Sequence, residues 1–153
     1  MGKANHDWIV LNFEKSLKTF LEKEIDLLEV NANERSLAHK LAEHMQVNFS
    51  KWNVDCEYNR NLLNIKKDSK HKRVNPDIIV HKRKTDKNIL VVEVKKTKKS
   101  IYSNEIQKDR ERLHEFTSFP FNFSLGLLVV FNIKTPKSFP IIEKYICEKL
   151  VDP

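Results

Sequence analysis

Apolar residues recur every three or four positions in several stretches of the chain, and this period predicts amphipathic α-helices. The first stretch covers residues 7–30, and the Asn31-Ala32-Asn33 segment then breaks the pattern and can cap a following helix. A second helix is predicted at 34–48, where apolar residues form one stripe. Two more helices are predicted at 103–117 and 138–150, the last with a proline near its first turn.

Other stretches carry the signals of β-strands. Apolar and polar residues alternate at 53–59, which is the period of a half-buried strand. Three runs rich in Val, Ile and Leu predict more deeply buried strands, at residues 77–83, 88–95 and 125–131. The short polar segment 84–87 joins two of these runs and predicts a hairpin, whereas the basic segment 66–73 predicts a loop.

The predicted element order is therefore ααβββαβα, which indicates a mixed α/β fold with a central sheet covered by helices. A length of 153 residues fits one domain around one core, and no repeat or linker divides residues 1–153. Hydrophobic residues make up 40% of the chain and charged residues 32%, which is typical of a folded chain rather than a disordered one.

Composition narrows the function classes. The net charge of +7 favours a polyanionic partner, and nucleic acid is the commonest one. With only two glycines, the chain has no Gly-rich phosphate-binding loop. The two cysteines form no CxxC pair, which argues against a structural zinc site or a disulfide framework.

The apolar segments are too short for a membrane protein. None reaches the roughly 18 residues of a membrane span, and the N-terminus lacks the apolar segment of a signal peptide. We therefore expect a cytoplasmic protein with no membrane partner. The sequence leaves a homodimer open, because the apolar face of the N-terminal helix could pair with a second copy or pack on its own core.

Three charged residues interrupt the apolar strands, namely Asp77, Glu93 and Lys95. Buried charges cost free energy unless they are paired or hold a metal ion. Residues two apart in a strand share a face, so Glu93 and Lys95 should point the same way. Hairpin pairing should bring Asp77 close to Glu93. We therefore expect two carboxylates and one ammonium group to converge at one end of the sheet.

Such a group suits the hydrolysis of phosphodiester bonds. Two carboxylates and a backbone carbonyl form the all-oxygen site that Mg²⁺ prefers. The ion can polarise a scissile phosphate and lower the pKa of a bound water molecule. A lysine beside the ion can orient or deprotonate that water and offset charge in the transition state.

Pro76-Asp77, a gap of 15 residues and Glu93-Val94-Lys95 resemble the motif of the PD-(D/E)xK, or restriction-endonuclease-like, nuclease superfamily. The resemblance implies a mixed sheet with flanking helices in αβββαβ order, here at about 34–131, with an extra helix at each end. It implies that Asp77 and Glu93 ligate Mg²⁺, for which Mn²⁺ can substitute. The Val94 carbonyl would complete the ligand set, and Lys95 would support the nucleophilic water.

The resemblance also points to residues outside the motif. Many members place a glutamate at the start of the first core helix, which implies that Glu34 joins the metal and catalytic site. The alternative is that Glu34 only favours the helix N-terminus electrostatically. Gln107 occupies a position where relatives often have a Gln or Tyr that touches the substrate, or it is an ordinary polar helix residue. Glu57 is a weaker candidate for an extra carboxylate, and Asp55 is weaker still.

Two basic runs flank the proposed metal site, one before Asp77 and one after Lys95. A phosphate backbone must pass there, and lysine and arginine contacts to phosphates give salt-dependent, sequence-tolerant affinity. With Gln107, the residues expected to bind nucleic acid are Lys72, Arg73, Lys96 and Lys98.

The sequence thus predicts a Mg²⁺-dependent nuclease that hydrolyses DNA, with endonucleolytic cleavage favoured and RNA left open as a substrate. The alternative is a non-catalytic nucleic-acid-binding protein, or a partner subunit that retains the nuclease fold. Buried carboxylates weigh against the alternative, because they repel phosphate unless a cation neutralises them.

Overall fold

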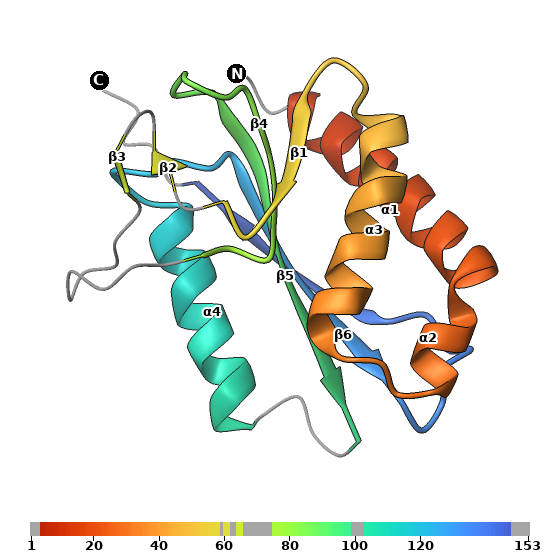
Figure 1. Ribbon diagram of the computed structural model, residues 1–153. Coiled ribbons are helices and arrows are strands. Elements are labelled where there is room, and N and C mark those ends of the chain that lie inside the picture. Colours follow the sequence, from red (N-terminus) through yellow and green to blue (C-terminus); the bar gives the residue numbers. More distant parts are fainter. Residues whose placement is uncertain (1–3, 59, 62–63, 66–74, 99–102, 148–153) are drawn as a thin grey trace.

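A five-stranded mixed sheet with the strand order β1-β4-β5-β6-β7 forms the centre of the computed structural model (Figure 1). The structure describes residues 4–58, 60–61, 64–65, 75–98 and 103–147. The sheet consists of β1 (Asn53–Cys56), β4 (Ile78–His81), β5 (Asn88–Thr97), β6 (Leu125–Asn132) and β7 (Ile141–Ile146). All neighbouring strands are antiparallel except β5 and β6, which are parallel.

Helices cover both faces of this sheet (Figure 1). On one face lie α1 (Ala4–Lys23), α2 (Ile25–Glu29) and α3 (Glu34–Asn48), and on the other lies α4 (Asn104–Phe116). A small second sheet pairs β2 (Arg60–Asn61) with β3 (Asn64–Ile65). From α3 to β6 the larger elements follow the expected α-β-β-β-α-β order, with this small sheet inserted. Of the helices described, none combines the length and apolar character needed to cross a membrane.

The helix that begins at Glu34 has the predicted bounds because its sequence specifies both its start and its buried face. The side chain of Asn33 accepts a hydrogen bond of 2.8 Å from the Ser36 N–H, which caps the helix. The apolar stripe then buries Leu37, Leu41 and Met45. The longer helix predicted at 7–30 is divided into α1 and α2 at Glu24.

The core has two layers, one on each face of the sheet. Leu90, Val92 and Val94 of β5 pack with the apolar residues of α1 and α3. Val91, between them, packs instead with residues of α4. This alternation leaves Glu93 and Lys95 facing α4, because side chains two residues apart share a face.

The closing helix predicted at 138–150 is wrong for its described part, because Ile141–Ile146 form strand β7. Its six residues pair antiparallel with β6, from Leu125 opposite Ile146 to Val130 opposite Ile141. Without β7, the buried strand β6 would leave a row of backbone N–H and C=O groups unpaired at the sheet edge. The β-branched and aromatic residues of the segment favour a strand as well.

Two smaller differences concern strand ends. The strand predicted at 53–59 stops at Cys56, because Glu57 takes a left-handed backbone conformation with a φ of 50°. The strand predicted at 77–83 is shorter as well and ends at His81. The basic segment 66–73 lies outside the described residues.

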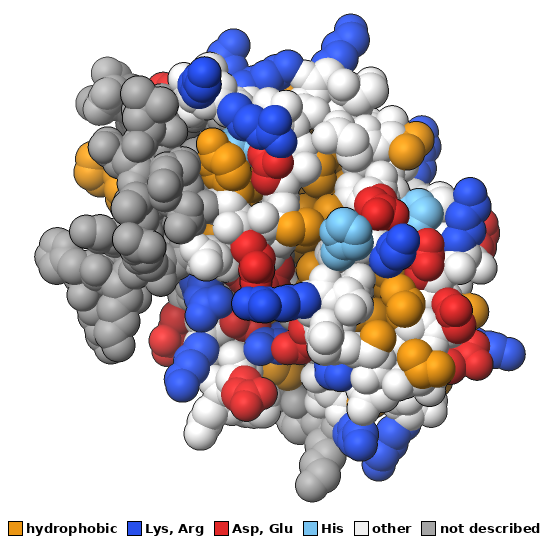
Figure 2. Space-filling view, in the orientation of Figure 1, with side chains coloured by type: hydrophobic (Ala, Val, Ile, Leu, Met, Phe, Trp, Pro, Cys, Tyr) orange, Lys and Arg blue, Asp and Glu red, His pale blue; other side chains and the backbone are white. Residues whose placement is uncertain are grey.

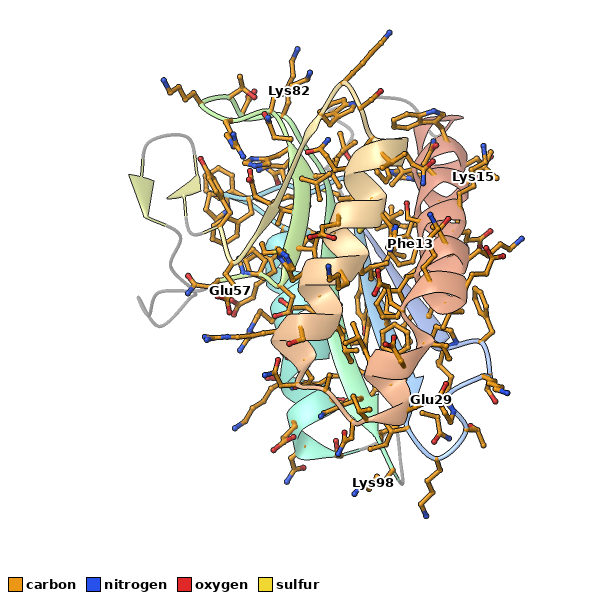
Figure 3. The ribbon with its side chains drawn as sticks, turned by 45° about the vertical axis from the view of Figure 1, so that its right-hand side comes forward. Phe13, Lys15, Glu29, Glu57, Lys82 and Lys98 are labelled. Carbon is orange, nitrogen blue, oxygen red and sulfur yellow. The ribbon has the colours of Figure 1, made fainter. Side chains whose placement is uncertain are left out.

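Phe13 provides a test of the core. Its side chain is completely buried between α1 and the sheet, while Lys15 points away from the core (Figure 3). Phe13→Ala should lower the free energy of unfolding by about 3–5 kcal/mol, because it removes a packed ring and leaves a cavity. Lys15→Ala should change it by less than about 0.5 kcal/mol. Urea titrations followed by circular dichroism measure both, and equal losses would contradict this placement.

Candidate active site

The start of β4 lies beside β5 in a fixed register. Ile78 is opposite Val92, so the same register continued by one residue places Asp77 opposite Glu93. The Oδ2 atom of Asp77 accepts a hydrogen bond of 2.8 Å from the Val94 N–H. The structure thus brings Asp77 next to the Glu93-Val94-Lys95 segment.

Glu93 is the most deeply buried charged residue of this group, with an exposed fraction of 1%. Burial raises its pKa well above the ordinary value, and the negative charge and hydrogen bond of Asp77 add to this effect. Within the described part of the chain, its Oε1 atom has no hydrogen-bond partner. A bare, buried carboxylate oxygen costs free energy, which is typical of a site that receives a cation.

Lys95 extends from β5 toward two carboxylates. Its Nζ atom lies 3.3 Å from Oδ2 of Asp109 and 3.6 Å from Oε1 of Glu34. Burial alone would lower the pKa of Lys95, but the charges of Asp109 and Glu34 outweigh it, and the pKa is raised. The side chain is therefore held as an ammonium ion.

Asp109 is a site residue that the sequence analysis missed. It lies on α4, is 4% exposed, and its Oδ1 atom is 3.8 Å from Nη1 of Arg112. Burial raises its pKa, while the charge of Lys95 acts in the opposite direction. The helical spacing could have indicated that Asp109 faces inward, because it follows Ile106 by three residues and precedes Leu113 by four, and both of these are buried.

Gln107 is exposed, and its Oε1 atom accepts a hydrogen bond of 3.3 Å from Nη1 of Arg110 on the same helix. Its contact with substrate stays a prediction. Two other residues of α4 contact the charged group, namely Asp109 and Arg112, whose Nη1 atom lies 4.0 Å from Oε2 of Glu93.

Glu34 connects the start of α3 to β5. Besides its contact with Lys95, its Oε2 atom accepts a hydrogen bond of 2.9 Å from the Lys96 N–H. The ammonium group of Lys96 donates to Oδ1 of Asn31 at 2.8 Å and to the carbonyl of Ala32 at 2.9 Å. Lys96 thus fixes the segment that precedes α3.

The other basic residues expected to bind nucleic acid divide into two groups. Lys98 is exposed just beyond the end of β5 (Figure 3). Lys72 and Arg73 lie outside the described residues. Figure 2 shows acidic and basic side chains gathered over the region between α4 and α3. The candidate site therefore lies within a mixed charged surface rather than a purely basic one.

A pocket of about 190 Å³ opens beside Asp77, between α3 and the end of β1. Its lining residues are Arg35, Ala38, His39, Glu57 and Asp77. The Glu57 N–H donates a hydrogen bond of 3.2 Å to the Asp77 carbonyl, and its Oε1 atom lies 3.1 Å from Nε of Arg35. Glu57, the weaker carboxylate candidate, is therefore a neighbour of the site.

Asp55 has a different environment. Its Oδ2 atom lies 2.7 Å from Nε2 of His81, and both of its carboxylate oxygens contact Arg83. Burial would raise the pKa of Asp55, but the hydrogen bonds from Arg83 and His81 lower it overall. Asp55 therefore belongs to a separate ion-pair cluster.

Among the residues described, no group of three or more His, Cys, Asp or Glu side chains is arranged to hold a metal. The buried Oε1 of Glu93 and the carboxylate of Asp77 are oxygen atoms of the kind that Mg²⁺ prefers as ligands. The Val94 carbonyl faces the same neighbouring strand as its N–H. The continued register places Val94 opposite Pro76, which has no N–H to donate.

Comparisons with protein-family models, with curated proteins and with solved structures gave no match to this chain. The resemblance to the PD-(D/E)xK superfamily therefore rests on the sequence motif and on the order of helices and strands.

Glu93→Gln tests the buried charge. The pKa of Glu93 exceeds its ordinary value of 4.5 in the folded chain, so the unfolded chain loses this proton first as pH rises. Folding stability should fall as pH increases from 4.5 toward the folded pKa. In EDTA at pH 7.5, Glu93→Gln should therefore raise the free energy of unfolding by about 1–3 kcal/mol, with a smaller gain near pH 4.5.

Urea titrations at the two pH values measure this difference, and the exposed Glu111→Gln on α4 is the matched control. Mg²⁺ at ten times its Kd should raise the free energy of unfolding of the wild-type protein by about 1.4 kcal/mol more than KCl of equal ionic strength does. It should raise that of Glu93→Gln only slightly. A wild-type protein that is more stable than Glu93→Gln in EDTA at pH 7.5 would contradict this view of Glu93.

Proposed function

We propose that the protein is a Mg²⁺-dependent nuclease of the PD-(D/E)xK type that hydrolyses phosphodiester bonds of DNA, with endonucleolytic cleavage favoured. The observation that carries the proposal is that Asp77 contacts the Glu93-Val94-Lys95 segment, where a buried oxygen of Glu93 has no hydrogen-bond partner among the described residues. A binding protein without catalysis has no use for such a costly carboxylate, whereas a metal-dependent hydrolase needs it.

Each residue has a role that its surroundings support. Asp77, Glu93 and the Val94 carbonyl would hold Mg²⁺, or Mn²⁺ in its place. The bound ion would supply Lewis-acid chemistry by polarising the scissile phosphate and lowering the pKa of a water ligand. Lys95 donates hydrogen bonds to the attacking water and to the phosphate, and its positive charge offsets the charge of the transition state. Its raised pKa favours this cationic role over that of a general base.

Substrate binding follows from charge. The net charge of +7 attracts a polyanion, and Arg112 at the rim of the site is 41% exposed and can reach solvent and substrate. The preference for DNA over RNA comes from the resemblance to the superfamily. A small nuclease that cuts both strands of a duplex is often a dimer, and a homodimer would place one such site on each strand. A cytoplasmic location, where DNA and Mg²⁺ are both present, belongs to the same proposal.

Lys95→Ala is the direct test of catalysis. We expect the wild-type protein to cut supercoiled plasmid, single-stranded DNA or branched DNA with Mg²⁺ or Mn²⁺, and not in EDTA. Lys95→Ala should reduce the rate by about a hundredfold or more, because it removes the cation beside the reacting phosphate. Lys15→Ala removes the same charge from a distant surface and should cut like the wild type.

The rates are measured by gel electrophoresis of time courses. A Lys95→Ala protein that cuts as fast as wild type would show that the activity comes from elsewhere. Binding of DNA without cleavage under any metal condition would favour the alternative of a non-catalytic binding protein or partner subunit.

Asp109→Asn tests the residue that α4 adds to the site. Asp109 holds the ammonium group of Lys95, so its neutral isostere should lower kcat by about 10- to 100-fold, with a smaller change in KM. Glu111→Gln on the same helix is exposed and should keep the wild-type kcat. Steady-state cleavage of a fluorescent oligonucleotide separates kcat from KM. An unchanged kcat in Asp109→Asn would remove Asp109 from the site.

A further inference from the structure

Two residues that line the pocket beside Asp77, Arg35 and Glu57, form an ion pair. Nε of Arg35, in the first turn of α3, lies 3.1 Å from Oε1 of Glu57, just beyond β1. Both side chains line the pocket together with Asp77. The pair therefore lies at the pocket that Asp77 of the candidate active site also lines.

This ion pair is easy to exchange. The side chain of Arg35 is 83% exposed and that of Glu57 is 43% exposed. Exposed ion pairs contribute little net stability, because both groups stay hydrated and screened by salt. A guanidinium group binds phosphate through the same two-pronged geometry that it uses for carboxylates. A phosphate group could thus replace the Glu57 carboxylate at little cost.

The backbone on both sides of the pair is anchored to the candidate active site. Arg35 follows Glu34, whose carboxylate contacts Lys95 and the Lys96 N–H. The Glu57 N–H donates to the Asp77 carbonyl, and this contact holds Glu57 in its left-handed conformation. Such conformations cost free energy and are frequent at functional sites. A phosphate in this pocket would therefore lie close to the phosphodiester that the candidate site would cleave.

We propose that this pocket binds a backbone phosphate of the nucleic-acid strand next to the scissile one, and that Arg35 exchanges Glu57 for that phosphate when the strand binds. The inference rests on the proposed function. The Glu57 carboxylate competes with any single anion for Arg35, so a small anion gains little by entering. A nucleic-acid strand displaces the carboxylate because its other phosphates bind at the same time.

Binding of fluorescein-labelled DNA oligonucleotides, followed by anisotropy with Ca²⁺ and with EDTA, tests this inference without cleavage. Arg35→Ala should weaken binding about tenfold, because it removes a charged hydrogen-bonding partner of one phosphate. It should also reduce the slope of log K against log salt concentration by about 0.7–0.9, the value for one phosphate contact. Arg35→Lys should lie between Arg35→Ala and the wild type.

Lys15→Ala is the matched control, since it removes one positive charge on α1, far from Glu57 (Figure 3). It should change the affinity by less than about twofold, because Lys15 lies on another element than the pocket residues and salt screens its charge. Circular dichroism and melting temperatures verify that each variant is folded. A loss in Lys15→Ala equal to that in Arg35→Ala would overturn the inference, because net charge alone would then explain it.

Glu57→Gln tests whether a phosphate replaces the Glu57 carboxylate on Arg35 or is only attracted by the charge of Arg35. It should tighten binding by up to about fivefold, the range expected for loss of an exposed competitor. The loss caused by Arg35→Ala should be larger in the Glu57→Gln background than in the wild type, because no carboxylate then competes for the guanidinium. Equal losses in the two backgrounds would overturn the exchange.

Inorganic phosphate distinguishes a strand phosphate from a free one. It should displace the oligonucleotide no better than chloride at equal ionic strength. Stronger displacement would mean that the pocket takes free phosphate, which overturns the inference. Wild-type protein that binds and cuts DNA with an unchanged affinity in Arg35→Ala would overturn the inference alone. Wild-type protein that neither binds nor cuts would overturn the proposed function as well.

Discussion

The hydrogen bond from the Val94 N–H to the Asp77 carboxylate is the contact on which the candidate site depends. It joins the residue before β4 to the middle of β5. The register that sets Ile78 opposite Val92, continued by two residues, would place Pro76 opposite Val94. Because proline has no N–H, an ordinary ladder hydrogen bond to the Val94 carbonyl cannot form there. The backbone of β5 is therefore open to a side-chain carboxylate, and to a cation, at the point where Glu93 turns toward α4.

Charge balance supports the proposal that a divalent cation binds at this point. Among the described residues, the contacts of the site involve four carboxylates, those of Glu34, Asp77, Glu93 and Asp109, and two cations, Lys95 and Arg112. Burial is the largest cause of the raised pKa of Glu93, and the charges of Asp77 and Asp109, which belong to this excess of negative charge, raise it further. Protonation of Glu93 relieves part of the excess, and binding of a doubly charged ion would relieve all of it. Metal binding and deprotonation of Glu93 should therefore be coupled.

Local sequence specified the parts of the fold that depend on near neighbours. Asn33 and the stripe that begins at Leu37 define α3, and strand alternation places Glu93 and Lys95 on one face. The same alternation, with a hairpin, was enough to predict that Asp77 lies near Glu93. These features need only the period of the pattern and a short connection.

The remaining features depend on contacts between distant segments. Ile141 and Ile142 fit a helix or a strand by themselves, and it is the open edge of β6 that makes the segment a strand. The period of α4 turns Asp109 inward, but only the packing of α4 on β5 reveals that it meets Lys95. The turn at Glu57 is equally hidden, because its left-handed backbone is held by the distant Asp77 carbonyl.

Two arginine–carboxylate pairs near β1 differ in how far they are buried, and this difference decides whether each pair can be exchanged for another partner. Asp55 is held by Arg83 and by the buried His81, its side chain is 15% exposed, and its lowered pKa reflects those hydrogen bonds. The carboxylate of Glu57, two residues further, pairs with the exposed side chain of Arg35 at the pocket. Loss of the Asp55 contacts would leave buried groups unpaired, which costs free energy, and the ion pair of Asp55 therefore stays formed. Losing the Glu57 contact costs little, so a phosphate can take its place beside the residues proposed to cleave the strand.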